Sequence, residues 1–235
     1  MYIWLYSILV ISYIILFIWG IFLIRSERKI KRGNRYDETV VILFVIFGLL
    51  YDNIIILFGS TIGEGSTLQF LSYIRFWMHA LITPTLILFI WRISEQLNIN
   101  FATKLWSKIL AYLLTIGLVI YELIMSVFPL KLKATYEHSL LQYEPVANQQ
   151  PIMVIVITAV LALIGIILIV KFRVYSLFVG TLLITLGALF AIPFGNAIMN
   201  LFELFLLISL LITKNYQIKF CRKIIPLRTR NVRFV

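Results

Sequence analysis

Runs of about 20 mainly apolar residues, the length that a helix needs to cross ~30 Å of bilayer hydrocarbon, recur along this chain. Only helices and closed barrels satisfy every backbone polar group in that setting. These runs lack the alternation of polar and apolar residues that is typical of barrel strands. The chain is 62% hydrophobic and 13% charged, whereas a soluble domain has roughly 45–50% and 25%. The sequence therefore predicts an all-α integral membrane protein.

Seven of these runs are expected to be transmembrane helices, at about residues 2–24, 40–59, 68–93, 105–128, 151–170, 174–194 and 196–213. An excess of Lys and Arg marks the cytoplasmic loops of membrane proteins. In this layout 18 of the 21 basic residues fall on one side. We therefore predict a seven-helix bundle with its N-terminus outside and its C-terminus in the cytoplasm, in the plasma (cytoplasmic) membrane. The first run is expected to be a span and not a cleaved leader, because its positive charges follow it.

The soluble segments indicate one membrane domain, residues 1–214, and a basic cytoplasmic tail, residues 215–235. Residues 130–150 form the longest external loop. The net charge of +11 lies beside the spans, where it suits anionic lipid rather than nucleic acid. Cys221 is the only cysteine and the histidines are His79 and His138, so we expect neither a disulfide nor a metal site. No cofactor is expected.

Ionisable side chains inside the spans are the strongest functional signal, because an ionised group in a bilayer costs ~2.5–3.5 kcal/mol and is usually paired or functional. Residues 51–91 hold Asp52, Asn53, Arg75 and His79 in two apolar runs joined by a Gly/Ser/Thr turn. At about 1.5 Å of rise per residue, Asp52, Arg75 and His79 all fall in the outer half of the membrane. The same half receives polar residues from two other spans.

Glu122 lies near the external end of the fourth span. Asn196, Asn200 and Glu203 share one face of the seventh, because they follow an i, i+4, i+7 spacing. The matched depths predict a single outward-facing polar pocket. Its candidate catalytic residues are His79, Asp52 and Glu203, and its candidate ligand-binding residues are Asn53, Arg75, Glu122, Asn196 and Asn200.

Structural explanations of the same residues stay open. Asp52 and Arg75 form an ion pair in one of them, and His79 is then an interhelical hydrogen-bonding group. Glu122 lies close enough to the interface to be solvated. Asn196 is well placed to cap the seventh helix.

The third span, SYIRFWMHALITPTLILF, is similar to the third helix of microbial rhodopsins. In that family an Arg precedes a Thr-Thr-Pro step by the same interval as Arg75 to Pro84, and here the step reads Ile82-Thr83-Pro84. The resemblance implies a rhodopsin-shaped bundle of seven helices. The family's counterion aspartate would fall on Met78, and the seventh span has no lysine before Lys214. Covalent retinal is therefore not implied.

Three functions fit these features. The first is a carrier or sensor that binds a proton or small polar ligand through Asp52, His79 and Glu203, with Arg75 as the counter-charge. The second is an enzyme acting on lipid or polyprenyl head groups, with His79 as a general base oriented by a carboxylate. The third is a non-catalytic subunit whose tail docks anionic lipid or a protein partner. The first has slight preference, because no nucleophile or metal motif is present.

Overall fold

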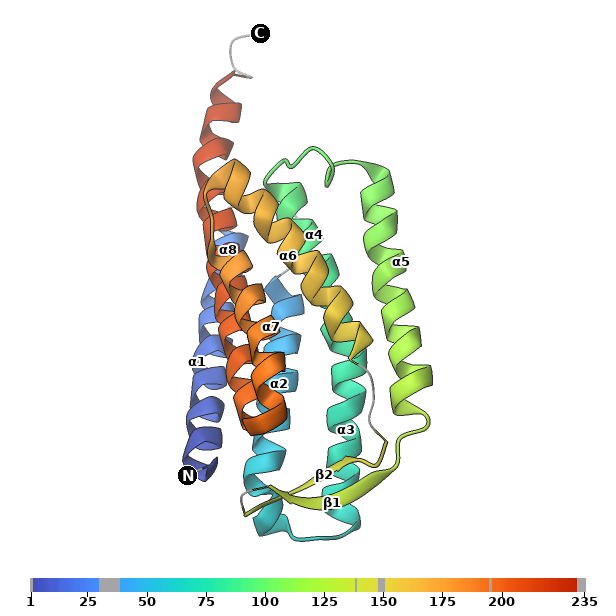
Figure 1. The fold of residues 1–235 in the computed structure, drawn as a ribbon. Helices are drawn as coiled ribbons and strands as arrows, with labels where there is room; N and C mark the ends of the chain where they lie inside the picture. The colour runs from blue at the N-terminus through green and yellow to red at the C-terminus, as the bar shows by residue number, and fades with distance from the viewer. Residues whose placement is uncertain (1, 30–38, 138, 148–150, 195, 232–235) are drawn as a thin grey trace.

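The computed structural model describes residues 2–29, 39–137, 139–147, 151–194 and 196–231, with side chains described except at 189–194, 196 and 224–231. Seven helical rods run up and down a bundle, and the two termini lie at opposite ends of it (Figure 1). The rods are α1 (Tyr2–Arg28), α2 (Thr39–Ile62), α3 (Ser66–Ile82) continued by η1 (Thr83–Thr85) and α4 (Leu86–Gln96), α5 (Leu105–Glu122) continued by η2 (Leu123–Val127), α6 (Ile152–Phe172), α7 (Ser176–Phe194) and α8 (Asn196–Asn231).

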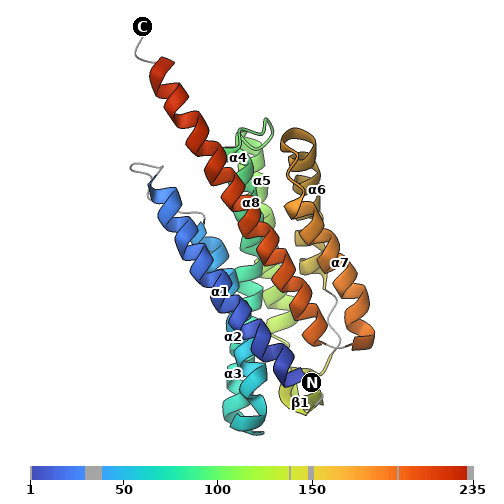
Figure 2. The ribbon, with the colours of Figure 1, turned by 90° about the vertical axis from the view of Figure 1, so that its left-hand side faces the viewer.

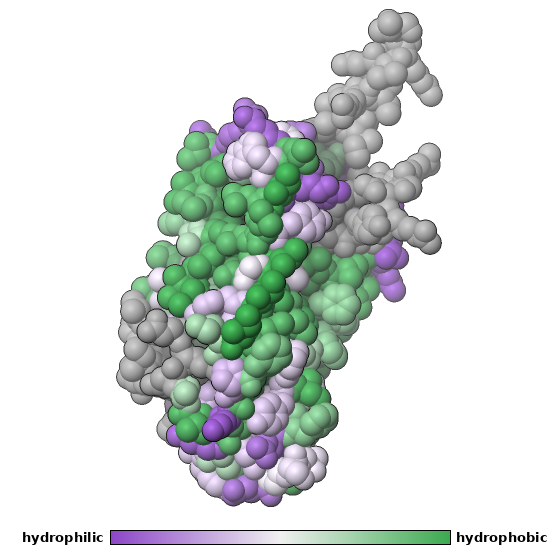
Figure 3. Space-filling model, turned by 90° about the vertical axis from the view of Figure 1, so that its right-hand side faces the viewer, coloured by the Kyte–Doolittle hydropathy of each residue, from purple (hydrophilic) through white to green (hydrophobic). Residues whose placement is uncertain are grey.

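The predicted class, a helical membrane protein, is confirmed by the length and composition of these helices. Six of them are long and apolar enough to cross a membrane, and α7 carries a shorter apolar segment, Ser176–Ala188. The face shown in Figure 3 is hydrophobic through its middle, with hydrophilic residues gathered towards both ends. A girdle of apolar surface between two polar ends is what a bilayer requires of the protein that spans it.

The third rod changes its winding where the sequence places proline. Pro84 lacks an N–H and cannot complete the α-helical ladder, and Thr83–Thr85 forms a single 3-10 turn. The rod then continues as α4, where Phe89, Ile90 and Ile93 are buried in the main hydrophobic core. The third span is therefore one membrane crossing with a turn of different pitch in its middle.

The segment 130–150, predicted to be a loop, contains an antiparallel hairpin of β1 (Leu132–Glu137) and β2 (Leu140–Pro145). It docks on the end of α2 at Gly59, where a Cβ atom would lie 1.9 Å from the Leu141 carbonyl oxygen. The Ser60 hydroxyl donates to the Ser139 carbonyl at 3.0 Å and accepts from the Leu141 amide at 2.9 Å. Only glycine permits so close an approach of the two backbones. The hairpin is thus a fixed part of the bundle end.

The last helix is longer than predicted. The sequence analysis ended the seventh span near residue 213, but α8 continues to Asn231 and Gln217 and Ile218 are buried. Tyr216 and Phe220 pack their rings against Phe172 of α6, with centroids 6.2 and 5.4 Å from it. These contacts stabilise the part of α8 that lies beyond the predicted end of the seventh span. The boundary between membrane domain and tail after Lys214 stays a prediction.

A buried ion pair joins three helices at the end of the bundle opposite the hairpin. Lys214 Nζ lies 2.8 Å from Glu27 Oε1, and the two side chains are 0% and 2% exposed. The Thr39 hydroxyl donates to Glu27 Oε2 at 2.7 Å. The pair therefore ties α8 to the last turn of α1 and the first turn of α2, and Figure 2 shows α1 and α8 side by side on this face.

Replacing Lys214 by methionine should destabilise the protein by about 3–5 kcal/mol, because the buried Glu27 carboxylate loses the cation that lies 2.8 Å from it. Thermal unfolding in detergent measures the loss. The double variant Glu27→Met, Lys214→Met should recover most of it, since neither charge is then buried. Lys219→Met, at an exposed site further along α8, is the matched control and should leave the unfolding midpoint unchanged. A single variant as stable as the wild type would contradict the assigned role.

Candidate functional site

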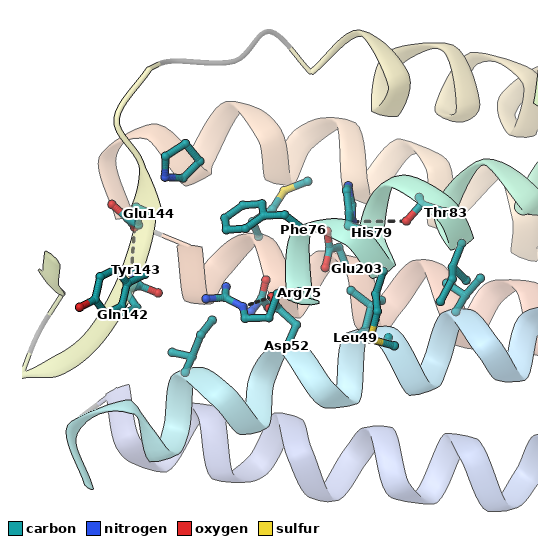
Figure 4. A pocket seen from close by; sticks show the side chains of 18 of the residues that line it. Leu49, Asp52, Arg75, Phe76, His79, Thr83, Gln142, Tyr143, Glu144 and Glu203 are labelled. Atoms are coloured by element: carbon teal, nitrogen blue, oxygen red, sulfur yellow. Dashed lines mark hydrogen bonds and ion pairs between the residues drawn. The ribbon is translucent and has the colours of Figure 1, made fainter. Parts of the chain in front are cut away.

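A cavity of about 480 Å³ lies at the hairpin end of the bundle, between α2, the α3–η1 rod, α8 and the hairpin (Figure 4). Its volume falls within the roughly 300–1,000 Å³ that is typical of small-molecule sites. It brings together five of the side chains predicted from the sequence, namely Asp52, Arg75, His79, Asn200 and Glu203.

Asp52 and Arg75 form an ion pair across the α2–α3 contact. Arg75 Nε donates to Asp52 Oδ1 at 2.6 Å, and the side chains of Arg75 and Asp52 are 10% and 24% exposed, respectively. The Arg75 guanidinium also lies over the Phe76 ring, with Cζ 5.7 Å from the centroid. Its Nη1 atom is buried and has no hydrogen-bond partner among the residues that the structure describes. The pair neutralises two intramembrane charges but leaves one donor of the guanidinium unsatisfied.

His79 lies one helical turn beyond Arg75 on α3, deeper in the cavity. Its Nδ1 atom is 3.3 Å from the Thr83 hydroxyl, so a neighbour four residues further along the same rod orients the ring. Glu203 reaches the cavity from α8, on another wall (Figure 4). Among the residues that the structure describes, Glu203 has no ion-pair partner.

Asn53 does not line the cavity, although the adjacent Asp52 does. Its side chain is fully buried and accepts a hydrogen bond from Asn200 Nδ2 at 3.1 Å. Its own amide donates to the Leu49 carbonyl at 2.8 Å, and the Tyr13 hydroxyl donates to the Asn200 carbonyl at 3.0 Å. Asn53 therefore fastens α2 to α8 behind the cavity, and Asn200 alone of the two reaches the ligand side.

Two predicted ligand-binding residues are not brought into the site by the described contacts. Glu122 is the last residue of α5 and is absent from the cavity lining. Asn196 is the first residue of α8, and its side chain lies outside the described residues. The role of Asn196 in ligand binding therefore stays a prediction.

The hairpin supplies a wall that the sequence analysis missed. Gln142, Tyr143, Glu144, Pro145 and Ala147 line the cavity. The Gln142 amide donates to Glu137 at 2.7 Å and to Glu144 at 2.9 Å, and Gln142 is 2% exposed. β-Branched and aromatic residues in TYE and LLQYE were the available signal for strands. Where such a hairpin docks is a tertiary property that the signal does not contain.

The chemistry on offer is recognition by charge and hydrogen bonding. The lining combines carboxylates, a guanidinium, an imidazole and two amides. Within the described part of the chain, no three His, Cys, Asp or Glu side chains are grouped so as to hold a metal ion. Among the described contacts of His79, the hydrogen-bonding neighbour of the imidazole is the Thr83 hydroxyl.

The fold and this site define the chain as a polytopic helical membrane protein with a polar cavity among its spans. No protein-family model matches the chain, and no curated protein matches its sequence. The resemblance of the third span to microbial rhodopsins therefore stays a prediction.

Disrupting the Asp52–Arg75 pair should destabilise the protein from either side. Asp52→Ala and Arg75→Ala are each expected to lose about 2–4 kcal/mol, because each leaves a largely buried charge unpaired. The double variant should lose clearly less than the sum of the two. Thermal unfolding of the four proteins in detergent gives the coupling, and Glu64→Ala in the exposed α2–α3 turn is the control. Additive losses would show that the pair contributes nothing beyond its separate side chains.

Proposed function

We propose that this chain is a multi-pass protein of the cytoplasmic membrane whose cavity faces outwards and binds a small polar ligand, as a carrier or a sensor. The observation that carries the proposal is the meeting of Asp52, Arg75, His79 and Glu203, from three helices, around one cavity of ligand size. Intramembrane charges are costly to keep. Of these four described side chains, Asp52 and Arg75 have a structural explanation as an ion pair.

The proposed orientation follows from charge. The C-terminal end of α1, the N-terminal end of α2, the loops that join α4 to α5 and α6 to α7, and the C-terminal end of α8 lie at one end of the bundle (Figure 1). These segments hold most of the Lys and Arg residues, which favours the cytoplasm for that end. The cavity, the hairpin and the N-terminus are at the other end, so we place them outside.

Binding is favoured over catalysis by the surroundings of His79. The enzyme hypothesis needs a carboxylate that orients the imidazole as a general base. The hydrogen-bonding neighbour of His79 is instead Thr83. Such a histidine is suited to donate to or accept from a ligand.

Ligand binding can be tested by filling the cavity without touching its polar groups. Gly48 lines the cavity, and a Cβ atom there would make only ordinary contacts, 3.9 Å from Ile82 and Met78. Purified wild-type protein, heated with a panel of small cationic, anionic, zwitterionic and neutral metabolites, should show a saturable rise of its unfolding midpoint with at least one class. Gly48→Met should abolish that rise.

The matched control is Gly117→Met, because a Cβ atom at Gly117 on α5 would meet open space. Both variants should fold, since methionine favours helix over glycine by roughly 0.5–1 kcal/mol. A rise that survives in Gly48→Met would place the ligand elsewhere. No rise with any class would sink the binding function.

Orientation has its own test, because Cys221 is the only cysteine. In a Cys221→Ser background, Glu64→Cys lies in the exposed α2–α3 turn and Asn100→Cys in the exposed α4–α5 loop. On intact cells a membrane-impermeant maleimide should label the first and should label the second only after permeabilisation. The reverse pattern would invert the proposed topology.

A further inference from the structure

Among the described side chains that line the cavity, the acidic groups outnumber the permanently basic ones. Asp52, Glu144 and Glu203 are carboxylates, Arg75 is the one permanent cation among the lining residues that the structure describes, and His79 lies between Arg75 and the cavity's deeper end. Arg75 is engaged by Asp52. Among the described residues Glu203 has no ion-pair partner, and a carboxylate that is partly shielded from water attracts a cation more strongly than it does in water.

The charge of the surrounding protein has the same sign. The half of the bundle that contains the cavity holds six of the ten acidic residues but three of the 21 basic ones, in a chain whose net charge is +11. The acidic residues are Asp52, Glu64, Glu122, Glu137, Glu144 and Glu203, and the basic ones are Arg75, Lys131 and Lys133. A cleft within an acidic region concentrates cations and repels anions.

Arg75 adds a second requirement. Its side chain is nine-tenths buried at the cavity wall, and Nε donates to Asp52, whereas no described residue offers Nη1 an acceptor. A buried donor without a partner is costly. Because Asp52 already neutralises the guanidinium, an uncharged oxygen is enough to complete the donor set. The ligand that fits both observations carries a positive group and an oxygen acceptor.

The remaining lining narrows the kind of cation. Phe76, Tyr143 and Met199 also line the cavity, and aromatic faces and thioether carbons suit the weakly hydrated methyl groups of an organic ammonium better than a bare metal ion. No described group of three or more metal-ligating side chains occurs here. The cavity of about 480 Å³ also exceeds what an inorganic cation fills.

We propose that the cavity takes a small organic ammonium compound with an oxygen acceptor, its positive group against Glu203 and its oxygen towards Arg75. This assignment rests on the proposed function of the cavity as a ligand site. It goes further in naming the ligand class and the side chain that selects it.

Choline is the probe, since it carries both groups in a small molecule. Its comparators are 3,3-dimethylbutan-1-ol, which has the same shape without the charge, tetramethylammonium, which lacks the oxygen, and acetate, which has the opposite charge. Affinity for the purified wild-type protein in detergent is measured by titration calorimetry and by ligand-dependent unfolding midpoints. Choline should bind about tenfold or more tightly than the neutral isostere and more tightly than tetramethylammonium, and acetate should not compete.

The variant arm uses Glu203→Gln, which keeps the shape of the side chain and removes its charge. Choline should bind to Glu203→Gln no more tightly than the neutral isostere binds to the wild-type protein. The affinity for the neutral isostere should be the same in the variant and the wild type. Glu64→Gln, which removes an exposed charge at the same end of the bundle, should bind choline as the wild type does. The unfolding midpoint of each variant without ligand shows that it is folded.

Equal binding of choline and its neutral isostere would overturn the assignment, as would tighter binding of acetate or choline binding that survives in Glu203→Gln. The ligand series on the wild-type protein decides even if a variant fails to fold. If choline does not bind but another class in the metabolite panel does so in a Gly48-dependent way, this inference fails and the proposed function stands. If no class binds, both fail.

Discussion

Two opposite charges buried where α1, α2 and α8 meet set the arrangement of the bundle. Removing each ion from water costs several kcal/mol, and the 2.8 Å contact between Lys214 and Glu27, with Thr39 as a further donor, offsets that cost only while the three helices stay together. The pair thereby fixes the register of α8 against its neighbours. Eleven residues before Lys214, or about 16 Å along the same helix, Glu203 enters the cavity.

Three residues beyond Glu203, on the side away from Lys214, amide contacts attach α8 to the same two helices. Asn200 on α8 donates to Asn53 on α2, and Tyr13 on α1 donates to the backbone of Asn200. The ionisable groups of the cavity come from α2, α3, α8 and the hairpin, whereas none is supplied by α5, α6 or α7. The molecule therefore combines a polar axis, built on helices that are fastened to one another, with an apolar set of helices beside it.

The sequence predicted those parts of the structure that depend on local composition or on the high free energy of an unpaired charge in a bilayer. Each span is readable alone, and the matched depths of Asp52 and Arg75 placed both side chains in one predicted pocket, with their ion pair as one of the open explanations. Which of Asp52 and Asn53 faces the cavity could not be predicted from the sequence. Adjacent helical residues face directions about 100° apart, and the packing of the helices decides between them. The hairpin wall depends on the fit of Leu141 over Gly59. Glu27 and Lys214, 187 residues apart, each sit where a charge at the end of an apolar run would ordinarily be solvated.

The same ion pair bears on how an outward cavity would be used. A carrier must open the opposite end of the bundle. If that movement separated Glu27 from Lys214 without admitting water, each charge would stay buried without the other, which is costly. A ligand shifts a conformational equilibrium only by its difference in affinity for the two states. A small displacement of α8 that leaves the pair intact needs far less. Because α8 runs without a break from Glu203 past Lys214 to Asn231 (Figure 2), a displacement of this helix at the cavity would be carried to the opposite end of the bundle.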